Sequence, residues 1–201
     1  MWDRIERLSQ PAAEPLTLDE VKRHGRIDSA DENAWLLSAI RAARQAIEGP
    51  AGAGVAIVAA QWRLSLDRFP AEIWIPMGPV ISVNAITYRD AAGTMQTLAP
   101  ARYQWRKGIL EARIKPAHGD AWPTVRDQYD AVQATFTAGF PGTENAQPDL
   151  SAIDEPLKVA MLMLIRHWDA NRETVVVGQM PAEMPLGFTN LVNRYRVGRF
   201  A

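Results

Sequence analysis

The sequence contains no cysteine, so it can form no disulfide, no thiolate metal site and no cysteine nucleophile. It also lacks a long apolar run. The longest uninterrupted run, residues 159–165, is far shorter than the ~20 residues that a membrane-spanning helix needs. The first residues, MWDRIERLSQP, carry charges among their apolar side chains, unlike a secretory signal peptide. We therefore expect a soluble protein that is intracellular when made and has no membrane partner.

Neither sign of charge is in excess. The chain has 22 Lys and Arg residues and 23 Asp and Glu residues, and its formal net charge is −1. A protein that binds nucleic acid through phosphates normally has a basic excess or a basic run, and only residues 194–201 are locally basic. A sheet-based nucleic-acid binder is still an alternative, because the aromatic rings of residues 103–107, YQWRK, could stack on bases. These residue types are more common at protein interfaces.

Catalytic and metal-binding motifs are missing as well. The chain has three histidines, and it contains no Gly-x-Ser-x-Gly, His-Glu-x-x-His or calcium-loop pattern. His167 precedes Asp169 by two residues, which leaves a small hydrolase as an alternative, but a histidine near a helix C-terminus needs no catalytic role. The glycine-rich residues 49–54 lack the Gly-Lys-Ser/Thr ending of a phosphate loop, and we expect a flexible connector there. The sequence predicts no enzyme, no cofactor and no metal site.

Two helices are predicted near the start of the chain. Thr17 and Glu20 have the spacing of a capping box, and Gly25 is expected to end the short helix that they open. Residues 29–32, SADE, repeat this signature. They predict a longer helix, which stops before the Gly-Pro pair at residues 49–50.

Helical signals return near the end of the chain. Asp154 is predicted to cap a long helix, with Pro156 in the first turn, where a missing N–H is harmless. This helix is apolar most of the way round, which predicts that it is the central one. Residues 185–197 predict a short last helix, with Leu191, Val192 and Tyr195 facing inward.

The residues between these helices have the period of two that half-buried strands show. Turn residues, chiefly Gly, Pro and Asp, separate the short runs. Strands of this length and spacing predict an antiparallel sheet or a small barrel. The predicted strands are residues 61–67, 73–75, 80–88, 95–98, 102–105, 110–114 and 131–138.

The predicted fold is α+β, a single domain over residues 1–201. Two N-terminal helices in residues 17–48 and two C-terminal helices in residues 153–198 form a small helical bundle, and an antiparallel β module at about residues 59–140 is inserted between its halves. An inserted β module is more often a protein-binding or ring-forming addition than an active-site floor. The sequence therefore favours an interaction protein.

An ordered set of motifs along nearly the whole chain resembles the head–tail connector (adaptor) proteins of long-tailed phages, prophages and gene transfer agents. The most specific motif of the set is HWDANRE, which is followed by VVVG and PLG. The motifs are EPLTLDEVK (14–22), DENAWLLSAIRAAR (31–44), QWRLSLDRFP (61–70), IPMGPVISV (75–83), FTAGF (136–140), HWDANRE (167–173), VVVG (175–178) and PLG (185–187).

The resemblance implies a non-enzymatic virion protein. Copies of it are expected to form a dodecameric ring under the portal protein, to extend the DNA channel and to present a surface to the stopper or tail-terminator protein. DNA would pass through the ring only as cargo. Assembly is expected in the bacterial cytoplasm, and the finished location is the head–tail interface of the particle. The runner-up role is a stopper or tail-completion protein of the same neck.

The resemblance also assigns two groups of contact residues, both near the C-terminus. The first group is expected to dock on the portal and contains Arg194, Tyr195, Arg196, Arg199 and Phe200. The second group is expected to form an extended arm that a neighbouring subunit or the portal covers. It contains Val175, Val176, Val177, Met180, Met184, Leu186 and Phe188.

Overall fold

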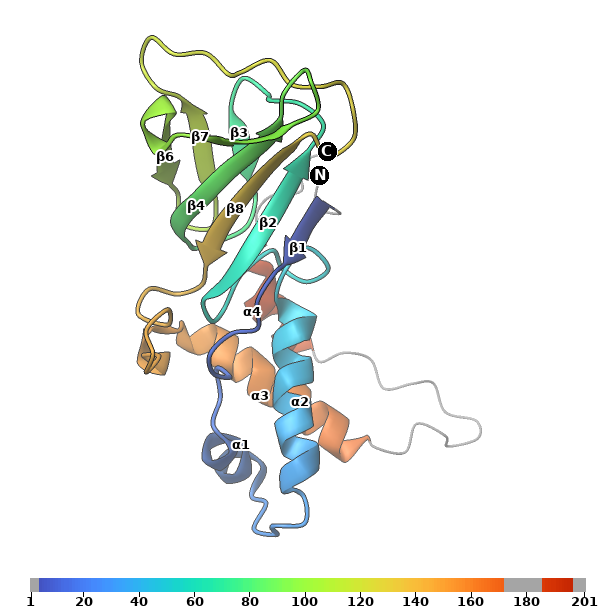
Figure 1. Ribbon diagram of the computed structural model, residues 1–201. Coiled ribbons are helices and arrows are strands. Elements are labelled where there is room, and N and C mark those ends of the chain that lie inside the picture. The colour runs from blue at the N-terminus through green and yellow to red at the C-terminus, as the bar shows by residue number, and fades with distance from the viewer. Residues whose placement is uncertain (1–3, 172–185, 197–201) are drawn as a thin grey trace.

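The computed structural model describes residues 4–171 and 186–196 and has an α+β fold. The strands gather at one end of an elongated molecule and the helices at the other (Figure 1). The helices are α1 (Leu18–Gly25), α2 (Asn33–Ile47), α3 (Glu155–Ala170) and α4 (Leu186–Asn193). The strands are β1 (Ile5–Arg7), β2 (Ala60–Leu66), β3 (Ile73–Ile75), β4 (Val80–Arg89), β5 (Met95–Leu98), β6 (Tyr103–Lys107), β7 (Ala112–Pro116) and β8 (Val132–Ala138). The predicted fold class is confirmed.

Two antiparallel sheets make up the β module. One has the strand order β1-β2-β8-β4-β5, and the other has the order β3-β7-β6. Strands β2 and β8 pair along their whole length, with Trp62 opposite Phe136 and Leu64 opposite Ala134. Alternate residues of both sheets, including Ile114 of β7, enter one buried hydrophobic cluster. The period of two in the sequence therefore reflects a core that lies between two sheets.

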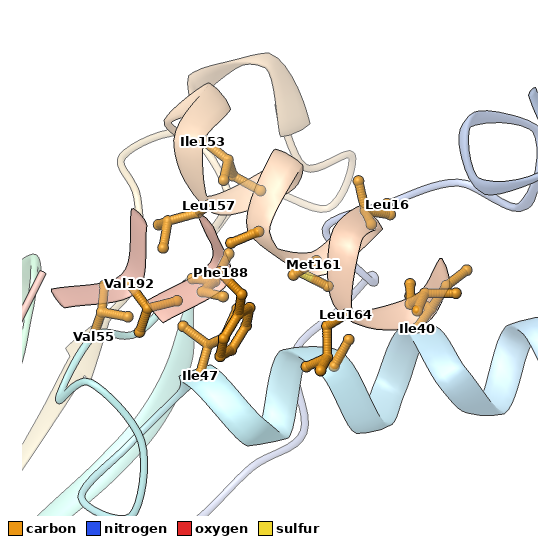
Figure 2. Packing of buried hydrophobic residues seen from close by; sticks show 14 of the residues in the cluster. Leu16, Ile40, Ile47, Val55, Ile153, Leu157, Met161, Leu164, Phe188 and Val192 are labelled. Atoms are coloured by element: carbon orange, nitrogen blue, oxygen red, sulfur yellow. The ribbon is translucent and has the colours of Figure 1, made fainter. Parts of the chain in front are cut away.

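A second hydrophobic core joins the helices (Figure 2). Helix α3 contacts each of the other three helices, which confirms that it is the central one. Its buried residues Leu157, Met161 and Leu164 share this core with Ile40 and Ile47 of α2. The apolar character of α3 around most of its circumference follows from these contacts on several sides.

Helix α1 begins with the predicted capping box. The Thr17 hydroxyl accepts a hydrogen bond from the Glu20 N–H at 3.2 Å, and the Glu20 carboxylate accepts one from the Thr17 N–H at 2.7 Å. Gly25 is the last residue of the helix, and the left-handed residue that ends it is Arg26, with a φ of 53°.

Two other helix starts differ from the predictions. Helix α2 begins at Asn33 and not near Ser29, because the Ser29 hydroxyl is used in a turn, where it accepts from the Asp31 N–H at 3.1 Å. Asp154 does precede α3, but its carboxylate makes no capping hydrogen bond. It accepts instead from the Tyr195 hydroxyl.

Strand β1 is not among the predicted elements, because three residues are too few to show a period. It exists through its pairing with β2, in which Ile5 lies opposite Leu64. Strands β6 and β7 begin one and two residues later than predicted. A 3₁₀ turn, Pro100–Arg102, precedes β6, and a turn in which the Gly108 N–H donates to the Glu111 carbonyl precedes β7.

The glycine-rich residues 49–54 form a defined turn and not the flexible connector that we expected. The Gly49 N–H donates to the Val55 carbonyl oxygen at 3.0 Å. A Cβ at Gly52 would lie 2.2 Å from the Ile47 carbonyl oxygen, so this close return of the chain onto α2 requires glycine. The turn leads from α2 straight into the buried segment before β2.

A buried ion network lies where the helices meet the β module. Arg44 is 1% exposed, and it donates to Glu48 at 2.5 Å and to Glu14 at 2.7 Å. Glu48 also accepts from Arg7 at 3.2 Å and from the Ile57 N–H at 3.0 Å. Burial raises the pKa of the Glu48 carboxyl, against the opposing effects of Arg44, the Ile57 N–H and Arg7. The network connects β1, α2 and the segment that enters β2.

Candidate functional site

The sequence left a hydrolase based on His167 and Asp169 as an alternative, and the geometry does not favour it. The two residues are two positions apart on α3, so their side chains leave the helix in different directions. Asp169 pairs with Arg166. Within residues 4–171 and 186–196, no group of three or more His, Asp or Glu side chains could hold a metal ion. In the same ranges, no helix is both long enough and apolar enough to cross a membrane.

Helix α4 is held against the chain by its own buried side chains. Phe188 and Val192 are 7% and 5% exposed and belong to the helical core. Figure 2 shows the Phe188 ring beside Ile47 of α2. Gly187 lies so close to α3 that a Cβ at this position would be 2.7 Å from the terminal methyl carbon of Met163. The position of α4 on α3 is therefore set by packing.

Tyr195 completes this contact at the other end of α4. The ring is buried, and the hydroxyl donates to the Asp154 carboxylate at 3.1 Å. Burial, together with the hydrogen bond and the charge of Asp154, raises the pKa of Tyr195 to about 12. Among the predicted portal-docking residues, Tyr195 thus holds α4 in place, whereas Arg194 and Arg196 are exposed. The other two, Arg199 and Phe200, lie outside the described residues.

Replacing Tyr195 by phenylalanine is expected to remove a late tyrosine titration. Because the folded-state pKa is above the ordinary value of about 10, the contact contributes fully below about pH 10 and is lost as the pH rises toward about 12. Near-ultraviolet absorbance of tyrosinate should show a step near pH 12 that Tyr195→Phe lacks. The control is Tyr129→Phe, because Tyr129 is 81% exposed and its replacement leaves the hydrogen bond from Tyr195 to Asp154 in place, so this variant should keep the step near pH 12. A late step of full size in Tyr195→Phe would contradict the assignment.

Two residues of the predicted inter-subunit arm are described, and they differ in exposure. Leu186 is 82% exposed, and Phe188 is 7% exposed. Because α4 packs on α3, the helical core of the same chain covers Phe188, which is therefore not free to contact a neighbouring subunit in this conformation. The other predicted arm residues lie outside the described part of the chain; they are Val175, Val176, Val177, Met180 and Met184.

The aromatic residues of β6 do not form an open stacking surface. Tyr103 lies opposite Pro116 and Trp105 opposite Ile114, on the side of the sheet that packs against the other sheet. Tyr103 is only 9% exposed, and Trp105 packs against the same cluster. Base stacking needs accessible ring faces, so the placement of these two rings weakens the nucleic-acid alternative.

The side of the β3-β7-β6 sheet that faces away from the other sheet, here called the outer face, carries residues that are scattered in the sequence. Trp74 lies opposite Arg113, whose guanidinium carbon is 5.0 Å from the centre of the indole ring, and the indole N–H donates to Glu111 at 2.6 Å. Arg106 lies on the other side of Arg113. A hollow of about 320 Å³ on this face is lined by Glu72, Gln104, Trp105, Arg106, Arg113 and Lys115.

One signal of the outer face was present in the sequence. Arg113 and Lys115 have the period of two that puts both side chains on one face of β7. The sequence does not show that β6 is the neighbour of β7 or that Arg106 is the residue opposite Arg113, because strand register depends on the whole sheet.

No protein-family model matches this sequence, and no curated protein matches it. Among the solved structures with chains that it resembles are three particle structures, and each of these matches covers 98% of this chain and 97% of the other. In the virion of a native gene transfer agent (GTA) particle, the identity is 28% and the TM-score 0.76. In the neck of an empty GTA particle computed with C6 symmetry, the identity is 27% and the TM-score 0.75. In the neck of a native GTA particle computed with C12 symmetry, the identity is 24% and the TM-score 0.69, a likeness of fold. Over nearly its whole length, this chain thus has the fold of chains found in gene transfer agent particles.

Proposed function

We propose that this chain is a structural neck protein of a gene transfer agent or a related phage-like particle, and that its role is that of the head–tail adaptor. Copies form a dodecameric ring that joins the portal to the stopper or tail and extends the DNA channel. The observation that carries this proposal is the match to a chain in the neck of an empty GTA particle, over 98% of this chain at 27% identity. The match spans both the helices and the β module. The similarity therefore includes the order and packing of all the elements and is not limited to one common motif.

The described surface suits a subunit that contacts several neighbours. In a closed ring, each subunit uses two different surfaces for its two neighbours, and an adaptor needs further surfaces for the components above and below. The exposed Leu186 and the two arginines near the end of α4 lie on the helical part, whereas the outer face lies on the β module. We assign portal docking to Arg194 and Arg196, with Arg199 and Phe200 beyond them. The near-neutral net charge limits attraction to DNA that passes through the channel.

Electron microscopy of purified particles tests the location. The protein should occupy the neck as a ring between the portal and the next component, and its absence from the neck would overturn the proposal. Pull-down with the purified portal and with purified tail components then separates the two neck roles. The adaptor should retain the portal directly, whereas a stopper would retain tail components and bind the portal only through another protein.

Leu186 and Phe188 provide a matched pair for testing assembly. Leu186→Ser is expected to change the free energy of unfolding of the isolated chain by no more than about 0.5 kcal/mol, because the side chain is 82% exposed. It should nevertheless weaken ring formation or portal retention, because it removes an exposed apolar anchor. Phe188→Ala should cost about 3–5 kcal/mol of folding stability, since it empties part of the helical core.

The control for Leu186→Ser is Ile109→Ser. Ile109 is 88% exposed, and it lies in the turn between β6 and β7 and not on α4. Portal retention is measured by pull-down and ring formation by light scattering. Equal assembly by Leu186→Ser and the parent chain would remove Leu186 from the proposed contact.

A further inference from the structure

We propose that the outer face of the β3-β7-β6 sheet is a docking site for an acidic segment of another protein, whose carboxylates pair with Arg106, Arg113 and Lys115. This site is separate from the C-terminal residues assigned to the portal. The proposal rests on the charged residues of this sheet, and it does not require that the chain forms a ring.

The first observation is a concentration of positive charge that is only partly compensated, because Glu72 and Glu111 pair with Arg113 alone. Arg106 and Arg113 are directly opposite each other on adjacent strands, and Lys115 is the next residue on the same face of β7. Like charges directly opposite each other destabilise a sheet. Arg106 and Lys115 are exposed, and among the described residues neither side chain makes a hydrogen bond or an ion pair. A carboxylate placed between these side chains would turn the repulsion into attraction.

The second observation is that Arg113 is already oriented. Its guanidinium lies over the Trp74 ring, and Glu72 and Glu111 each approach it at 3.5 Å. Trp74 is itself held by its hydrogen bond to Glu111. The Arg113 Nε is buried; it lies 3.5 Å from the Glu111 carboxylate without a hydrogen bond to it. A guanidinium that is held in place keeps its planar set of donors ready for a carboxylate, and little side-chain entropy is lost on binding.

The third observation is shape. The cations surround a hollow of about 320 Å³, and Glu72, Gln104 and Trp105 complete its lining. This volume is near the lower end of the range of about 300–1,000 Å³ that is typical of binding pockets. A hollow on an open sheet face suits one or two side chains of a docked segment and not a large rigid ligand.

A protein segment fits this surface better than nucleic acid does. Glu72 and Glu111 lie beside Arg113 and would repel a continuous row of phosphates. Arg113 covers one face of the Trp74 ring, the Tyr103 ring is buried and Trp105 is half-buried, so the sheet offers bases few open ring faces. Three clustered cations are few for a polyanion but are sufficient for two or three carboxylates.

The test uses the full chain and two labelled probes, a deca-glutamate peptide and a DNA duplex of similar length, in fluorescence anisotropy at low salt. We expect binding of the peptide, and we expect Arg106→Glu/Lys115→Glu to weaken it at least tenfold, because two charge-assisted contacts are reversed. Arg106→Gln/Lys115→Gln should weaken it by a smaller factor. The matched control is Arg23→Glu/Arg41→Glu, which reverses two exposed cations on the helices and should leave peptide binding unchanged.

A stability measurement accompanies the binding test. Arg106→Glu alone faces Arg113 with an opposite charge, so the melting temperature should stay level or rise by about 1–3 °C while peptide binding falls. Loss of binding in this variant therefore cannot be a loss of folding. No measurable binding of the peptide by the parent chain would overturn the proposal. So would equal weakening by the helix control, or a DNA affinity equal to or above that of the peptide.

Discussion

Replacing Gly139 by alanine is expected to lower the free energy of unfolding by about 3–5 kcal/mol. Gly139 follows β8 with a φ of +155°, and a Cβ there would lie 2.3 Å from the backbone nitrogen of Ala59. To avoid this overlap, the chain must move apart where the Gly139 N–H donates to Pro79 and the Phe140 N–H donates to Ile57. Chemical denaturation followed by tryptophan fluorescence measures the change.

Gly119→Ala is the control for this prediction. Gly119 also has a positive φ, of +81°, but a Cβ there would have no atom within 4 Å. Its cost should be only the backbone strain of a left-handed alanine, about 1 kcal/mol. Equal losses of stability in the two variants would contradict this prediction. They would mean that backbone strain explains the whole loss at Gly139 and that overlap with Ala59 adds nothing to it.

Replacing Glu48 by alanine is the second change with a large expected effect, a loss of about 3–5 kcal/mol of folding stability. The change removes the carboxylate that accepts hydrogen bonds from Arg44 and Arg7, and it leaves the buried Ile57 N–H without its acceptor. Arg44 is 1% exposed and would keep only Glu14, at the edge of the network. An uncompensated buried charge costs far more than a lost surface pair.

A double replacement tests this reasoning. Arg44→Met/Glu48→Met removes both buried charges and fills most of their volume, so its stability should lie well above that of Glu48→Ala. It should stay below that of the parent chain, because the Ile57 N–H still lacks its acceptor. Glu14→Gln is the milder control, because the Glu14 side chain is 28% exposed and solvent can replace part of its role. Urea denaturation of all four proteins gives the comparison. A double variant less stable than Glu48→Ala would mean that the ion pair itself stabilises the fold strongly.

Both predictions concern the junction between the helices and the β module. Glu48 connects β1, α2 and the segment before β2, and Gly139 lets β8 pass close to that same segment on its way to α3. The contacts at this junction are buried and hydrogen-bonded. In the proposed adaptor, such a junction would keep a portal-binding helical end and a β end at a constant separation while other components assemble on them.

Local signals predicted the elements that depend on neighbouring residues. The Thr17–Glu20 capping box is present because both of its hydrogen bonds join residues three apart. The apolar surface of α3 predicted a central helix, since only burial on several sides explains it. Predictions that needed a distant partner were less successful. Strand β1 exists only through β2, and residues 49–54 are held in place by their return onto α2.

The contact residues divide in the same way. The sequence identified Tyr195 as inward-facing, but not that its hydroxyl meets Asp154, 41 residues earlier. It grouped Leu186 with Phe188, although the packing of α4 on α3 exposes one and buries the other. The outer face was missed, because Trp74, Arg106 and Arg113 come from three strands.

By itself, the sequence determined the α+β order of helices, strands and helices, the start of α1 and the central position of α3. These features follow from periodicity and capping, which act within a few residues of the chain. Only the tertiary structure decided that Arg106 lies opposite Arg113 and that Leu186 is exposed. It also decided that Glu48 accepts hydrogen bonds from two arginines and a backbone N–H. Register and packing are properties of the whole fold, since each contact brings together side chains that no short segment of sequence contains.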